Sequence, residues 1–107
     1  MKDLDNIPTA CTTAEFRDRE ATLLAQFRSA VIESEELQGG YEFSLPGDSE
    51  SIELAGKLIM AERECCPFLA FALIVQPNKG LVIVRVTGPT GTKEFLRTIL
   101  CNTEGCT

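Results

Sequence analysis

Apolar residues recur at helical spacing in three parts of the chain. In residues 13–36 they follow the three- and four-residue steps of one helical face. A second apolar stripe runs from about residue 49 to residue 66 and stops before Pro67, because proline disfavours helical geometry in the residue that precedes it. A short third stripe occupies residues 92–100, and Thr92 is its predicted N-terminal cap. The pattern therefore predicts three helices.

Three further segments have the patterns of strands. Residues 41–45 alternate apolar and polar side chains, which is typical of a strand with one buried face. Residues 69–75 are apolar throughout, so we expect that strand to be covered on both faces. Residues 81–87 return after a hairpin loop at 76–80. The predicted order is α-β-α-β-β-α, an α+β fold with a three-stranded, mainly antiparallel sheet packed with helices.

The strand order is left open by this pattern. If the first two strands are parallel, the middle helix supplies the right-handed crossover that such a pair requires. The third strand then lies either beside them or between them. Three helices and three strands leave part of the sheet uncovered, and a homodimer would cover it.

The length of 107 residues predicts one domain over residues 1–107. Within it, residues 1–11 are predicted to be an extended arm, because Pro8 disfavours helix before it. Residues 101–107 are predicted to be a flexible tail, because apolar periodicity is lost after Leu100. The first residues are polar and acidic, without the apolar core of a signal peptide. We expect a soluble, cytoplasmic protein whose thiols are reduced.

Charge narrows the choice of partners. The chain holds 10 Lys and Arg against 16 Asp and Glu, a net charge of −6. Nucleic acids and anionic membranes select clustered positive charge, so we expect neither as a partner. No stretch is long enough to span a bilayer.

The strongest chemical signal is the group formed by Glu62, Cys65 and Cys66. Residues three and four apart lie on one face of a helix, so one carboxylate and two thiols converge at the end of the second helix. Soft thiolates favour thiophilic ions, and three ligands leave a coordination position open. We predict a metal site at these three residues. Cys101 and Cys106 are weaker, auxiliary candidates that could deliver an ion from the tail.

Two observations oppose an activated nucleophile. A helix carboxyl end carries partial negative charge, which raises the pKa of a thiol. The chain has no histidine to act as a general base, so a Cys-His enzyme is excluded. The alternative to metal binding is a structural or interaction module, homodimeric, whose cysteines pack in the core as small apolar groups. A third hypothesis is a small metal-thiol enzyme of the lyase type, with Glu62 as proton donor.

Two other features have plainer interpretations. Residues 88–93 precede a helix and could form an anion cradle from free amides and Lys93, but they lack the phosphate-binding loop pattern, so we favour a turn with a helix cap. Cys11 has no evident partner and is expected to pack beside the first helix. No nucleotide or flavin motif is present, and we expect neither cofactor.

Two strings carry a resemblance, ERECCPFLAF at residues 62–71 and TGPTGTKEFL at residues 87–96. They resemble a group of small uncharacterised bacterial proteins, some of them associated with resistance to mercury and other heavy metals. This resemblance covers most of the chain from Thr13 onward. The pair Cys65-Cys66 also resembles the paired thiols of mercuric reductase tails and mercury transporters, although the flavin and NAD motifs of the reductase are absent.

The leading hypothesis is a soluble, thiol-based protein that binds or carries a soft metal ion, either mercury or an ion of the zinc or copper kind. We expect binding rather than catalysis. The identity of the ion is left open.

Overall fold

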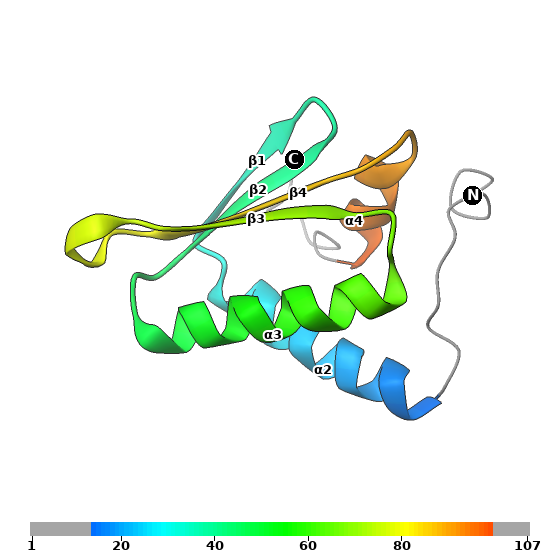
Figure 1. The fold of residues 1–107 in the computed structure, drawn as a ribbon, viewed down its shortest axis with the longest axis horizontal. Helices are drawn as coiled ribbons and strands as arrows, with labels where there is room; N and C mark the ends of the chain where they lie inside the picture. The colour runs from blue at the N-terminus through cyan, green and yellow to red at the C-terminus, as the bar shows by residue number, and fades with distance from the viewer. Residues whose placement is uncertain (1–13, 100–107) are drawn as a thin grey trace.

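The structure is a computed structural model that describes residues 14–99, and Figure 1 shows its ribbon. The chain is a single α+β domain, as predicted. Its elements in chain order are α2 (Ala14–Ala30), β1 (Glu33–Leu37), β2 (Gly40–Leu45), α3 (Ser49–Cys65), β3 (Ala70–Val75), the short 3-10 turn η1 (Pro77–Lys79), β4 (Val82–Thr87) and α4 (Thr92–Ile99). The predicted order α-β-α-β-β-α is therefore wrong by one strand, β1.

The first helix is shorter than predicted. We expected helix over residues 13–36, but α2 ends at Ala30 and the chain continues into β1. The amide of Ile32 already belongs to the sheet, because it donates to the carbonyl oxygen of Ser44 at 2.7 Å. The turn at residues 38–39 then folds β1 against β2 as an antiparallel hairpin. The glutamates of β1 would be exposed to solvent both in a helix and in an edge strand. Their polarity therefore did not indicate which of these two conformations the segment adopts.

The sheet has four strands rather than three, in the order β1-β2-β4-β3, and all of its pairs are antiparallel. The last strand therefore lies between β2 and β3, which run parallel to each other without pairing. Gly40 permits the close approach of β2 to β4, since a Cβ atom there would lie 1.8 Å from the carbonyl oxygen of Val86. This arrangement answers the question of strand insertion that the sequence left open.

The core lies on one face of the sheet, against the helices. Figure 1 shows α2 and α3 stacked beneath the strands. On that face the rings of Phe27 and Phe43 meet edge to face at 5.5 Å. The sheet side chains of the core come from β2 and β4: Tyr41, Phe43, Leu45, Val82, Val84 and Val86. The opposite face carries an exposed ion pair between Arg85 and Glu42 at 2.7 Å.

The prediction that residues 69–75 are covered on both faces is wrong. Strand β3 is an edge strand, and its side chains are exposed or half-buried throughout. Leu73 is 39% exposed and Val75 is 53% exposed. The continuous apolar run indicated a central strand, but β4 takes the central place and the helices pack on one face only.

The predicted arm at residues 1–11 and tail at 101–107 lie outside the described residues. The last helix is present as predicted: α4 begins at Thr92, which was expected to cap it from just outside, and is described to Ile99. Within residues 14–99, none of the helices combines the length and the apolar character that crossing a membrane requires.

Candidate thiol and carboxyl metal site

The end of α3 positions the predicted site. The helix begins after Asp48, whose side chain accepts a hydrogen bond from the amide of Ser51 at 2.8 Å. Its last residue is Cys65, and it is capped by Cys66, whose amide donates to the carbonyl oxygen of Glu62 at 2.6 Å. Pro67 follows and cannot continue the hydrogen-bonded turn. The predicted start and end of this helix are both confirmed.

The side chain of Glu62 lies beside the thiol of Cys66, as its spacing predicts. The Cys66 thiol donates to Oε1 of Glu62 at 3.6 Å. Both side chains are buried, since Glu62 is 2% exposed and Cys66 is not exposed at all. Cys65, one residue earlier, is also buried. The helix therefore brings a carboxyl group and two sulfur atoms into the interior.

A second carboxyl group, which the sequence analysis missed, comes from α2. Glu20 contributes an oxygen atom that lies with the sulfurs of Cys65 and Cys66 in a group whose ligand atoms are all within 4.8 Å of one another. A signal for it existed. Glu20 precedes Leu24 by four residues and Phe27 by seven, which places it on the buried face of its helix. Glu62 contacts Cys66 from beside this group.

Burial governs the electrostatics of the site. The pKa of Glu62 is raised to about 9, mainly because burial removes water from the carboxyl group. The hydrogen bond with Glu20 and the negative charge of Glu20 also raise this pKa, and the hydrogen bond with the Cys66 thiol lowers it. Among the described residues, Oε2 of the Glu62 carboxylate has no donor facing it. The protonated acid resolves this, because its O–H can donate to Glu20. Glu62 is therefore neutral at pH 7.

The thiol of Cys66 is neutral as well. Burial is the main cause of its strongly raised pKa, and the neighbouring carboxyl groups of Glu62 and Glu20 raise this pKa further. The sequence had indicated a thiol that is not activated, on the ground of the helix carboxyl end. The predicted increase in the pKa of the Cys66 thiol is confirmed, but its main cause is burial, and two neighbouring carboxyl groups contribute to it. The thiol alone is a poor nucleophile at neutral pH.

The two neighbouring cysteines differ in oxidation state. Cys66 is a free thiol, whereas Cys65 is disulfide-bonded. They are not joined to each other, as the strain of such a small ring predicts. The expectation that Cys65 is reduced is wrong for this structure. The three other cysteines of the chain, Cys11, Cys101 and Cys106, lie outside the described residues.

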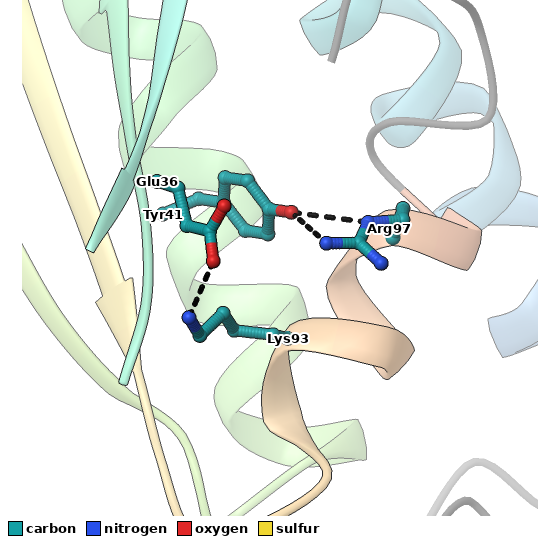
Figure 2. A network of polar contacts seen from close by, with 4 residues as sticks. All are labelled: Glu36, Tyr41, Lys93 and Arg97. Atoms are coloured by element: carbon teal, nitrogen blue, oxygen red, sulfur yellow. Dashed lines mark hydrogen bonds and ion pairs between the residues drawn. The ribbon is translucent and has the colours of Figure 1, made fainter. Parts of the chain in front are cut away.

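The turn at residues 88–93 borders a second feature, a cavity of about 420 Å³. Figure 2 shows that its cations are already engaged. Lys93 pairs with Glu36 of β1 at 2.5 Å, and Nη2 and Nε of Arg97 donate to the hydroxyl oxygen of Tyr41 at 2.8 and 3.1 Å. These contacts join α4 to the β1–β2 hairpin. They favour the turn over the anion cradle.

The predicted cap at Thr92 is wrong. Its hydroxyl is buried and has no hydrogen-bond partner among the described residues. Instead, the amide of Phe95 donates to the carbonyl oxygen of Gly91, whose φ of 97° is a conformation that glycine adopts readily. The hydroxyl of Thr92 packs over Gly88, where a Cβ atom would lie 2.5 Å from it.

In comparisons with known proteins, no family model, curated protein or solved structure matches this chain. The fold and the site must therefore define the class on their own. They define an α+β domain with a buried cluster of thiol and carboxyl groups between two helices.

Proposed function

We propose that this protein, with Cys65 reduced, binds a thiophilic metal ion through Glu20, Cys65 and Cys66. The observation that carries the proposal is the convergence of their ligand atoms within 4.8 Å. These residues come from two helices that are far apart in sequence, so the fold itself assembles the group. The sequence-based set of Glu62, Cys65 and Cys66 thus changes by one ligand, with Glu20 in the ligand set and Glu62 beside it.

The spacing suits several soft ions. Two sulfurs bound to one tetrahedral zinc ion lie roughly 3.8 Å apart, as bonds of about 2.3 Å require. A linear two-coordinate ion with bonds of similar length needs roughly 4.6 Å. Both values fit within the 4.8 Å group. Geometry therefore leaves the choice among zinc, copper and mercury to experiment, and the resemblance to proteins of mercury resistance favours mercury.

Metal binding and proton release are coupled at this site. Cys66 holds its proton in the free protein because burial and two carboxyl groups disfavour the thiolate. A bound cation reverses that balance, since it stabilises the thiolate directly. Glu62, which already contacts the Cys66 sulfur, then orients that ligand. Affinity should consequently rise with pH.

The disulfide at Cys65 sets a condition for binding. A sulfur that is bonded to another sulfur is not a thiolate ligand, so the site is complete only after reduction. A reducing compartment such as the cytoplasm supplies that condition. The oxidised protein should bind the same ions far more weakly.

The structural alternative has an observation in its favour, because Cys65 and Cys66 both belong to the apolar core. In that case the cysteines are packing groups and no ion is bound. Native mass spectrometry separates the two. The full chain is reduced, freed of reductant under nitrogen, and titrated with Hg(II) or Zn(II).

Under our proposal the parent takes up one tightly held ion, and the Cys65→Ser/Cys66→Ser double variant loses it. The matched control is Cys101→Ser/Cys106→Ser, which removes two thiols outside the proposed ligand set and should retain the ion. Glu20→Gln should weaken binding at least tenfold, whereas Glu64→Gln, an exposed neighbour of the site, should not. Equal binding by the parent and both cysteine double variants would show that the site is wrong.

A further inference from the structure

Strand β3 leaves one side of its backbone unpaired. It is the last strand in the order β1-β2-β4-β3, and β4 is its hydrogen-bonded neighbour. Within residues 14–99 its outer edge therefore presents free amide and carbonyl groups. Such a row is a template for another strand, and natural proteins commonly protect it with charges, proline or a bulge.

None of those protections is present on β3. The strand reads Ala-Phe-Ala-Leu-Ile-Val, without charge or proline, and it pairs with β4 in an unbroken register from Ala70 to Val75. Its apolar side chains are also accessible, with Leu73 39% and Val75 53% exposed. Leu81, just before β4, is 38% exposed, so three of the five large exposed apolar residues in the described chain lie on one hairpin. Exposed apolar side chains that lie together on one surface in this way mark an interaction site.

The opposite edge of the sheet is protected. Strand β1 reads Glu-Ser-Glu-Glu-Leu, and its side chains are exposed or half-buried. Three carboxylates on one short strand repel a second copy of the same strand, particularly in a chain of net charge −6. The two edges of one sheet thus differ in chemistry, and the difference directs association to β3.

We propose that β3 pairs with β3 of a second copy of this chain, in antiparallel orientation about a two-fold axis perpendicular to the sheet. This axis places the helix-covered faces of both sheets on the same side. The apolar side chains of one β3 therefore contact those of the other β3, and no like charges face each other. The four strands of each copy join into one continuous sheet, with the helices of both copies on the same side.

A second copy fits this edge better than an open series of contacts. The β3–β3 contact forms a closed dimer, because both copies use the same strand edge and no β3 edge stays available for a third copy. A contact of β3 with β1 would repeat without end and would place an acidic strand against an apolar one. The thiol site lies at the end of α3, before β3 in the chain, whereas the two-fold axis passes between the two β3 strands. Each protomer therefore keeps its own site.

Sedimentation velocity of the full-length, reduced, metal-free protein over about 1–200 µM tests the proposal. We expect a dimer that dissociates on dilution. Val75→Lys should weaken the dimer at least 100-fold, because each copy then places a charged side chain in the apolar interface. Met60→Lys is the matched control: Met60 is 63% exposed on α3 and is not part of the strand that pairs, so its variant should dimerise like the parent. Circular dichroism verifies that both variants are folded.

Hydrogen exchange of the parent gives a test that needs no variant. Amides of β3 that point away from β4 should exchange at least tenfold more slowly at the dimer concentration than on dilution. A parent that is monomeric throughout overturns the proposal and leaves the edge to a strand of a different protein. A dimer that survives Val75→Lys, or in which the β3 amides exchange freely, overturns it as well.

Discussion

At the residue scale, Glu62 is the least expected side chain of the core. A carboxyl group that is 2% exposed loses its hydration, and a neutral acid is the form that this environment accepts. Its contacts are polar, a thiol on one side and a second carboxyl group on the other. The Glu62 carboxyl group is therefore accommodated in its neutral form. Because it lies beside the proposed metal ligands, its ionised form would stabilise a bound cation.

The protonation of Glu62 links folding to pH. In the folded protein the carboxyl group keeps its proton up to about pH 9, whereas the unfolded chain releases it near pH 4.5. Between these values folding takes up a proton, so the free energy of unfolding falls as pH rises, by at most about 1.4 kcal/mol per pH unit. Urea unfolding of the reduced, metal-free protein from pH 6 to pH 9 measures this slope.

Glu62→Gln keeps the shape of the side chain and removes its titration. We expect this variant to unfold with a flatter pH profile and to be more stable than the parent at pH 9. If the parent and the variant share one slope, Glu62 is charged in the folded state. The same variant should bind its metal ion about 10–100-fold more weakly, because the Cys66 sulfur loses its orienting partner.

At the element scale, the sequence predicted those features that depend on residues close together in the chain. Helix α3 has its predicted ends, and Glu62 has its predicted contact with Cys66, because caps, proline and helical spacing act locally. It did not predict β1, whose glutamates are equally at home in an exposed helix. It also missed Glu20, since the packing of α2 on α3 joins residues that are far apart in sequence.

The close approach of β2 and β4 makes Gly40 sensitive to substitution. A Cβ atom there would lie 1.8 Å from a backbone oxygen of β4, so Gly40→Ala forces the two strands apart. We expect a loss of more than about 2 kcal/mol in the free energy of unfolding. Gly56→Ala, in α3, meets nothing within 4 Å and should stabilise the protein by about 0.5–1 kcal/mol. Thermal unfolding of both variants compares a steric effect with a helix propensity.

The attachment of α4 depends more on Tyr41 than on Lys93. The Tyr41 ring is buried and its hydroxyl accepts two bonds from the Arg97 guanidinium, whereas the Lys93–Glu36 pair is open to solvent. Tyr41→Phe should cost about 1–2 kcal/mol in stability. Lys93→Gln should cost less than about 1 kcal/mol, because exposed ion pairs are weak. Urea denaturation that ranks them in the reverse order would contradict this view of the network in Figure 2.

At the scale of the whole molecule, charge governs encounters. With a net charge of −6 and no basic run in the sequence, the protein should not bind nucleic acid appreciably. A mobility-shift assay with DNA and RNA at low salt checks this. A shift that fades as salt is added would indicate a basic surface made by the fold.

The position of β4 in the sheet has a consequence for folding during synthesis on the ribosome. The chain is synthesised from its amino end, so β1, β2, α3 and β3 leave the ribosome while the strand that belongs between β2 and β3 is still missing. Two strands that must lie parallel, with a gap of one strand between them, cannot hydrogen-bond to each other in the meantime. The nascent chain thus carries an unfinished sheet, with apolar β3 exposed, until β4 emerges. Folding of the sheet is then completed when β4 inserts between β2 and β3.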